Sequence, residues 1–263
     1  MINRVANRLL SVGGWGATLL CLTILFLPLF VLVVFSFNRF PYGVFPLKGF
    51  TWQWYQKLLR NDNIVRAILN SIYISSFATI AALILGSLAA YASDRAIKMK
   101  VRFEAFLYVP MIAPGIILGI SLAFLFHLLN LRLGLWSVVF GHVTFLAPFV
   151  FVLVSASLKR FDRRLELAGR DLGATGRQVF WLITLSVLKP TFLAAALFCW
   201  TLSFEEFIVT FFTIGSDSNL SMEVFSKLRV GVTPELNALG TLQILVAVIV
   251  GIWVSSKLEG VLD

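Results

Sequence analysis

Six long apolar runs constrain the fold of this chain more than any other feature of its sequence. The runs lie at about residues 15–37, 66–92, 104–127, 134–158, 191–214 and 236–257. A helix needs about 20 apolar residues to cross the hydrocarbon core of a bilayer, and every run is long enough. The runs also lack the period-two alternation of an outer-membrane barrel. The sequence therefore predicts an all-α membrane protein with six transmembrane helices.

The composition agrees with a lipid bilayer as the surroundings. Hydrophobic residues make up 59% of the chain and charged residues only 13%, too few to cover the surface of a soluble domain of this length. The net charge of +9 could suggest nucleic acid, but the Lys and Arg residues lie mostly in short loops beside apolar runs. We therefore expect no nucleic-acid partner. Cys21 and Cys199 lie inside apolar runs, where we expect them to pack as small hydrophobic residues.

The distribution of basic residues predicts the orientation in the membrane. With the N-terminus inside, 14 of the 22 Lys and Arg residues fall in internal segments and 8 in external ones. Cytoplasmic loops carry the excess of Lys and Arg, so both termini are expected in the cytoplasm. The first run is too long for a signal peptide and is expected to be retained. We expect one transmembrane domain over 1–263, with an N-terminal helix at about 15–37 and core helices over about 66–257.

The internal segment at about 159–190 carries local signals for two helices. Leu165, Ala168 and Leu172 share one face of a first helix, which Gly173 can end because glycine tolerates a left-handed backbone. Thr175 and Gln178 have the spacing of a capping box, which predicts the start of a second helix. The first helix is amphipathic. Amphipathicity alone supports docking of a soluble partner and contact with lipid about equally.

The order of residues in this segment resembles the cytoplasmic coupling loop of MetI-like ABC importer permeases. Anchored on Gly173, the family pattern falls on Leu167-Ala168-Gly169, Ile183 and Leu185. The glutamate of the family pattern falls on Leu167, and its proline falls on Ser186. Glu166 lies one residue early, and a helix rotates by about 100° per residue, so Glu166 cannot simply replace that glutamate. The residues that this resemblance assigns to ATPase coupling are Glu166, Leu167, Ala168, Gly169, Asp171, Leu172, Gly173, Ala174, Ile183 and Leu185.

Most of the chain is similar to the second permease subunit of spermidine/putrescine importers. The segments that carry this similarity include Leu135–Ser137, His142–Phe145 and, most specifically, Lys227–Ala238. The resemblance implies the type I importer permease fold, a five-helix core plus one N-terminal helix. It also implies an assembly in the bacterial inner membrane, with a paralogous permease, two copies of an ABC ATPase and a periplasmic substrate-binding protein. The partner ATPase would bind ATP and Mg, and this chain no cofactor.

The absence of a phosphate-binding motif agrees with a separate ATPase. A loop that cradles nucleotide phosphates ends in Gly-Lys, and no Gly-Lys dipeptide occurs in the chain. Neither a Gly-x-Ser-x-Gly elbow nor a metal-ligand spacing is present. The sequence therefore predicts a non-catalytic permease subunit.

Two adjacent carboxylates predict the substrate pathway. Glu205 and Glu206 lie inside the fifth apolar run, where an ionised carboxylate facing lipid would cost about 2.5–3.5 kcal/mol. One interpretation is an acidic patch for the ammonium groups of a polyamine, with Trp200, Phe204 and Phe207 as cation–π partners. The alternative is an ion pair with an Arg of the partner permease. The helix would point the two side chains about 100° apart.

Other solutes and another transport class remain open at this point. The third run has Pro114-Gly115 where the polyamine subunit has an aspartate after the proline, which weakens the preference for polyamines. Related permeases move aminophosphonates, opines or ferric iron. A secondary transporter would be expected to have inverted repeats and helices broken at the midplane. We expect Pro110 and Pro114 to kink the third helix, and His142 to hydrogen-bond between helices.

Overall fold

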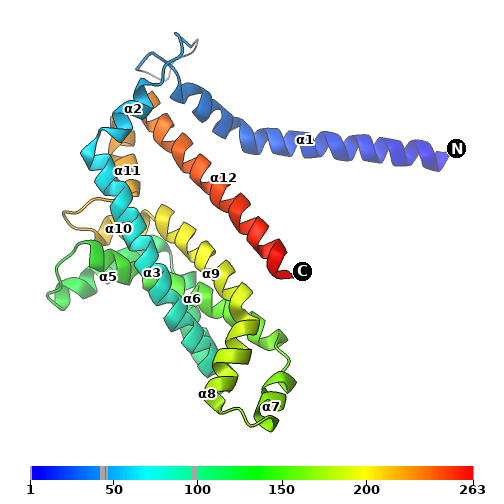
Figure 1. Cartoon of the computed structure of the whole chain (residues 1–263). Helices are drawn as coiled ribbons and strands as arrows, with labels where there is room; N and C mark the ends of the chain where they lie inside the picture. The colour runs from blue at the N-terminus through cyan, green and yellow to red at the C-terminus, as the bar shows by residue number, and fades with distance from the viewer. Residues whose placement is uncertain (1, 42–44, 46, 96–99, 263) are drawn as a thin grey trace. The chain divides into compact units, whose positions relative to one another are not determined.

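The computed structural model describes residues 2–41, 45, 47–95 and 100–262. Within these ranges the chain is helical, apart from loops and one isolated antiparallel bridge between Asn38 and Phe50. The elements are α1 (Ile2–Ser36), α2 (Gln53–Leu59), α3 (Asp62–Arg95), α4 (Lys100–Ile112), α5 (Gly115–Leu128), α6 (Leu135–Arg160), α7 (Arg164–Asp171), α8 (Gly176–Val179), the π-helical turn η1 (Phe180–Thr184), α9 (Leu185–Glu205), α10 (Ile208–Thr213), α11 (Leu220–Val230) and α12 (Pro234–Leu262) (Figure 1). The all-α prediction is confirmed for this part of the chain.

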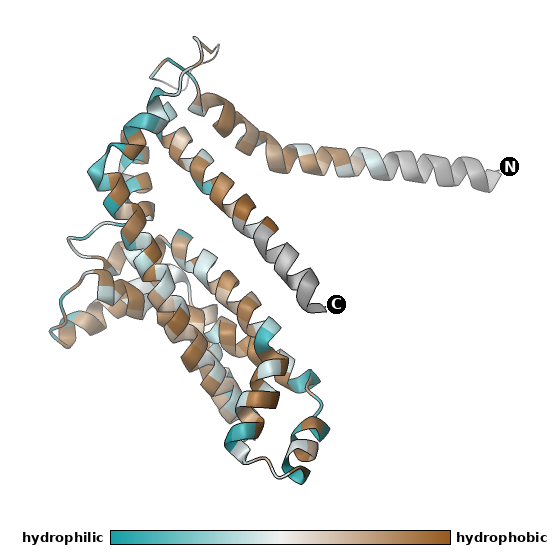
Figure 2. Ribbon diagram, in the orientation of Figure 1, coloured by the Kyte–Doolittle hydropathy of each residue, from teal (hydrophilic) through white to brown (hydrophobic). Residues whose placement is uncertain are grey.

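Within the described ranges, four helical segments are long and apolar enough to cross a membrane. They are Trp15–Ser36 of α1, α3, α6 and the continuous helix Gly176–Glu205. The bent pair α4–α5 makes a fifth if it counts as one span, and the apolar part of α12 described at Pro234–Ile249 is shorter. Figure 2 shows brown, hydrophobic colouring along these helices, whereas teal colouring gathers on the α7–α8 segment.

The third apolar run is not the single helix that the sequence predicts. Helix α4 ends at Ile112 and α5 begins at Gly115. The helix axis bends by 103° between them. Pro114 lacks an N–H and disfavours helical geometry at the residue before it, which explains the break at this point. Pro110 lies inside α4 without ending it. The predicted kink is thus confirmed at Pro114, but as a complete break.

The fifth apolar run is also broken, which the sequence analysis did not predict. Helix α9 ends at Glu205, Glu206 has an extended backbone (φ −67°, ψ 115°), and α10 begins at Ile208. Helix α10 packs against α5 and α6. A Cβ added to Gly119 of α5 would lie 2.8 Å from a ring carbon of Phe212, so the missing side chain allows close approach. Broken helices, which are expected in a secondary transporter, are thus present in this chain too. They therefore do not distinguish the two transport classes.

The chain divides into two compact units. The larger unit spans Arg66–Phe225 and has α6 at its centre, with α4 and α9 against it. Leu146, Val150 and Val154 of α6 are almost completely buried. A Cβ on Gly86 of α3 would lie 2.6 Å from the carbonyl oxygen of Ala147, so α3 and α6 approach each other at backbone distance.

The smaller unit comprises Met1–Val65 and Ser226–Glu259. Asn38 organises the loop after α1: its carbonyl accepts the indole N–H of Trp54 at 2.7 Å, and its side chain accepts the backbone N–H of Lys48 at 3.2 Å. At the start of α12, the Glu235 carboxylate lies 2.8 Å from the ammonium groups of both Lys57 and Lys227.

Candidate functional site

The segment between α6 and α9 has the local structure that its residues predict. Helix α7 ends in a Schellman motif: the Gly173 N–H donates to the Arg170 carbonyl at 2.9 Å, and the Ala174 N–H donates to the Gly169 carbonyl at 3.0 Å. Gly173 has a φ of +87°, a left-handed conformation in which glycine avoids the strain of a side chain. The predicted helix stop at Gly173 is confirmed.

The predicted capping box is also present. The Thr175 N–H donates to the Gln178 side-chain oxygen at 2.8 Å, and the Gln178 N–H donates to the Thr175 hydroxyl at 3.4 Å. These bonds start a continuous helix that runs to Glu205 and contains the π-helical turn Phe180–Thr184. No feature of the sequence analysis predicted that turn.

A close contact joins α7 to the π-helical turn. Gly169 is buried, and a Cβ at this position would lie 2.5 Å from the Cδ1 atom of Ile183. Only a residue without a side chain allows Ile183 to pack at this depth against α7. Two residues that the sequence analysis assigned to the coupling pattern therefore touch each other.

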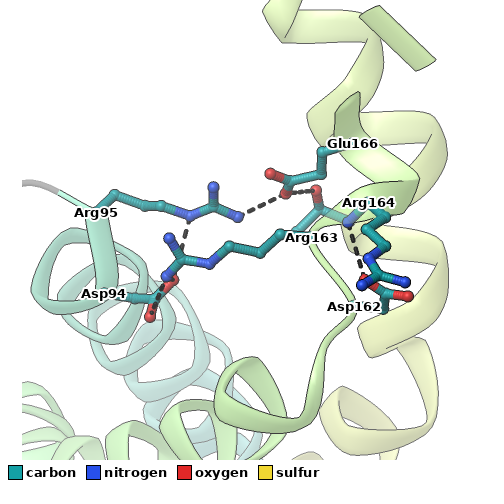
Figure 3. A network of polar contacts seen from close by, with 7 residues as sticks. Asp94, Arg95, Asp162, Arg163, Arg164 and Glu166 are labelled. Carbon is teal, nitrogen blue, oxygen red and sulfur yellow. Dashed lines mark hydrogen bonds and ion pairs between the residues drawn. The ribbon is translucent and has the colours of Figure 1, made fainter. Parts of the chain in front are cut away.

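Glu166 faces the interior of the protein. Its side chain lies among α3, α7 and η1, with a residue exposure of 5%. One carboxylate oxygen accepts hydrogen bonds from the Arg95 guanidinium at 2.6 Å and from the Thr184 hydroxyl at 2.7 Å (Figure 3). By contrast, Leu167 is 59% exposed and Leu172 is 89% exposed. The geometry agrees with the rotation argument, because adjacent positions of α7 face opposite surroundings.

The environment of Glu166 keeps its carboxylate charged. Burial raises the pKa of this carboxyl, but hydrogen bonds from Arg95 and Thr184 and the charges of Arg95 and Arg170 outweigh that effect. The pKa of Glu166 therefore lies below its ordinary value. The result is an ionised pair between α7 and the end of α3.

A second ion pair ties the same two elements together. Both carboxylate oxygens of Asp94 accept hydrogen bonds from the Arg163 guanidinium at 2.9 Å, and Arg95 lies 3.2 Å from Asp94 (Figure 3). No local sequence pattern pairs positions so far apart, so the sequence did not predict the roles of Asp94, Arg95, Arg163 and Thr184. Residues 96–99, which follow Arg95, lie outside the described residues.

The two carboxylates of the fifth run have different surroundings. The Glu206 side chain accepts the Val209 N–H at 2.9 Å, and its carbonyl accepts the Thr210 hydroxyl at 2.8 Å. Glu206 therefore caps the start of α10. Glu205 is exposed, and its side chain has no hydrogen bond or ion pair within the described part of the chain. The helical 100° relation does not apply to this pair, because the helix ends between them.

The predicted aromatic set is divided in the same way. The rings of Trp200 and Phe204 stack with centroids 5.1 Å apart and planes 18° apart, on the last two turns of α9. The Trp200 indole N–H donates to the Ser76 hydroxyl at 3.3 Å. Phe207 lies after the break and packs on Phe225, with centroids 4.7 Å apart. Glu205 thus shares α9 with Trp200 and Phe204, whereas Phe207 lies beyond the break.

His142 joins both sides of the break to α6. Its Nδ1 atom lies 2.7 Å from the Ser203 hydroxyl of α9, and its Nε2 atom lies 2.9 Å from the Thr210 hydroxyl of α10. The imidazole is completely buried. The predicted hydrogen bonding of His142 between helices is confirmed. These two bonds hold α9 and α10 in place on both sides of the break, next to the exposed Glu205.

Residues 82–263 match the family described as "binding-protein-dependent transport system inner membrane component". The chain belongs to this family. This permease is therefore a multi-pass inner membrane protein and the non-catalytic transport subunit of a binding-protein-dependent ABC importer.

Curated relatives of this permease cover nearly the whole chain. It is 36% identical over 225 residues to the spermidine/putrescine transport system permease protein PotC of Haemophilus influenzae, which covers 85% of this chain and 87% of that protein. It is also 36% identical over 239 residues to the putrescine transport system permease protein PotI of Escherichia coli, covering 87% and 85% of the two chains.

Solved structures agree with the permease fold. A bacterial ABC transporter involved in the import of the acidic polysaccharide alginate matches with a TM-score of 0.72 and 15% identity, over 96% of this chain and 97% of that chain. The MetNI methionine ABC transporter matches with a TM-score of 0.64 and 17% identity, over 76% and 96% of the two chains. At these identities the likeness concerns the fold of the permease alone.

Proposed function

We propose that this permease imports polyamines such as putrescine or spermidine. The two curated relatives, named for spermidine and putrescine transport, support this substrate class. The observation that carries the proposal is the exposed Glu205 carboxylate at the C-terminal end of α9, which has no partner among the residues that the structure describes. The last carbonyl groups of a helix also carry partial negative charge, so this end favours a cation. The stacked rings of Trp200 and Phe204 offer an aromatic face for an ammonium group.

The proposal includes the arrangement in the membrane. One transmembrane domain with six spans would place the α4–α5 and α9–α10 breaks within the bilayer, and both termini in the cytoplasm. The excess of basic residues in the internal segments supports this orientation. The permease would act beside a paralogous permease and receive substrate from a periplasmic binding protein. Alternating access between two such permeases would move the polyamine inward.

The assembly would include two copies of a partner ATPase, which would bind ATP and Mg, and the segment Arg164–Leu185 is this permease's proposed contact with that ATPase. Leu167 and Leu172 offer exposed apolar side chains on α7. The same helix is tied to α3 through Glu166 and Arg95, and to η1 through the packing of Ile183 on Gly169. A push on α7 would therefore move the ends of α3 and of the helix that leads to Glu205 together.

The test is ATP hydrolysis by the full complex in proteoliposomes, with binding protein and with putrescine or spermidine. We expect polyamine to stimulate hydrolysis in the wild type and to stimulate it much less in Glu205→Gln. Asp62→Asn is the matched control, because Asp62 is an exposed carboxylate at the start of α3. Full stimulation in Glu205→Gln would remove this carboxylate from substrate recognition. Stimulation only by another solute would overturn the polyamine proposal.

A further inference from the structure

The larger unit contains an apolar cavity of about 340 Å³ between the ends of α3, α6 and α9. Its wall includes Leu88 of α3, Leu158 of α6 and Leu188 of α9. Tyr91 and Phe180 close one side, with their rings edge to face at 5.3 Å. The cavity lies beside the π-helical turn, and such turns occur frequently at functional sites. Of the residues that the family resemblance assigns by number to coupling, Leu185 lines the cavity, and Arg177 and Phe180 of its lining also belong to the segment Arg164–Leu185.

A cationic side chain lines this cavity. Arg177 lines it, is exposed, and has no hydrogen bond or ion pair from its side chain within the residues that the structure describes. The described lining residues include no carboxylate, so a polyamine or another cation would find no counter-charge among them. The hydroxyl of Ser87, also in the lining, is buried and has no hydrogen-bond partner in the described part of the chain. An occupant with an apolar body, an acceptor group and an anionic end fits these three features.

The position of the cavity along the helices agrees with such an occupant. Tyr91 and Ser87 lie about one and two helical turns before Arg95, the charged end of α3. The lining residues of α9, from Leu185 to Phe192, extend over about 10 Å of helix. The cavity therefore runs from a charged helix end toward the apolar interior of the spans, as the upper part of a phospholipid acyl chain does.

We propose that this cavity binds an acyl chain of an anionic phospholipid, with the lipid phosphate at Arg177. This inference uses the orientation given in the proposed function, which places Arg177 at the cytoplasmic leaflet. Basic pockets between transmembrane helices on the cytoplasmic side bind anionic lipid head groups. The acyl chain moves from the apolar lipid interior into an apolar cavity. Packing therefore stabilises the bound acyl chain through van der Waals contacts rather than by transfer out of water. The charge of Arg177 then supplies the preference for an anionic head group.

The test uses the full transporter complex in nanodiscs with photoactivatable lipids that carry the reactive group on the acyl chain. A phosphatidylglycerol probe is compared with a phosphatidylcholine probe of the same chains, and labelled peptides are mapped by mass spectrometry. We expect phosphatidylglycerol to label the peptides around 87–91 and 185–192 more strongly than phosphatidylcholine does. In Arg177→Gln that labelling should fall about fivefold, the factor that corresponds to about 1 kcal/mol for one basic residue near an anionic lipid.

Two further variants separate a specific site from general attraction. Arg160→Gln removes an exposed arginine at the end of α6 that does not line the cavity, and we expect labelling to be unchanged. Leu88→Trp fills the cavity from an exposed position and should abolish the labelling. Equal labelling by the two probes, equal loss in Arg160→Gln, or a crosslink to a partner subunit in place of lipid would overturn the proposal. Labelling needs neither polyamine nor ATP, so its failure would leave the transport proposal intact.

Discussion

From the ion pair between Arg95 and Glu166 we predict that its loss lowers transport while ATP hydrolysis persists. The pair is 2.6 Å long, and its side chains are 23% and 7% exposed. Removing one partner of a buried pair costs about 3–5 kcal/mol, because the other charge stays buried without compensation. Since Arg95 is partly exposed, we take the lower end, about 3 kcal/mol. That value corresponds to a change of roughly 150-fold in the equilibrium between docked and undocked α7.

The perturbation is Glu166→Gln, which keeps the shape of the side chain and removes its charge. In the assembled complex, we expect amide hydrogen exchange in Arg164–Asp171 to accelerate, while exchange in the core of α6 is unchanged. Since one of the two ion pairs that connect this segment to α3 would be lost, α3 would follow α7 less closely, and the amount of polyamine transported per ATP hydrolysed should fall several-fold. ATP hydrolysis itself should persist, because this chain supplies no catalytic residue.

A double-mutant cycle tests the pairing directly. Arg95→Gln alone should behave like Glu166→Gln, and the double mutant should be less impaired than the sum of the two. Asp62→Asn is the matched control, because Asp62 is an exposed carboxylate at the other end of α3. Unchanged exchange in α7 and an unchanged ratio of transport to hydrolysis in Glu166→Gln would refute this reasoning, as would strictly additive effects in the cycle.

Three further predictions concern the same segment. Gly169→Val should displace Ile183 and destabilise the packing of α7 by about 1–3 kcal/mol, with partial rescue by Ile183→Ala; the melting temperature of the purified complex reports both. Gly173→Ala should cost about 1–2 kcal/mol through its φ of +87° alone, since no atom lies within 4 Å of the new Cβ, and Gly173→Asn should cost less in the same assay. Because the folded pKa of Glu166 lies below its unfolded value of 4.5, its stabilisation is complete above that pH and is lost as the pH falls through the folded pKa. The difference in melting temperature between wild type and Glu166→Gln should therefore be constant from about pH 6 to 8 and shrink below about pH 4; a difference that shrinks at pH 7 would contradict the assignment.

Properties that depend on neighbours within one or two helical turns could be predicted from the sequence. The lengths of the apolar runs predict helices, since a bilayer leaves no other partner for the backbone of a single segment. The stop at Gly173 and the capping box of Thr175 and Gln178 need only residues that are three or four positions apart. The rotation of Glu166 away from Leu167 follows from the geometry of one helix.

The breaks and the ion pairs were decided by tertiary structure. The apolar run continues through Glu206, and the helix ends there because Val209 and Thr210 find partners in Glu206 itself and because His142 of α6 holds both sides. Arg95 and Glu166 are 71 residues apart in the sequence. The chain has several Arg residues and several carboxylates near its basic segments, and the sequence does not say which Arg pairs with which carboxylate. Burial decides it: a charge removed from water must be matched by the charge that the packing of α3 and α7 places beside it.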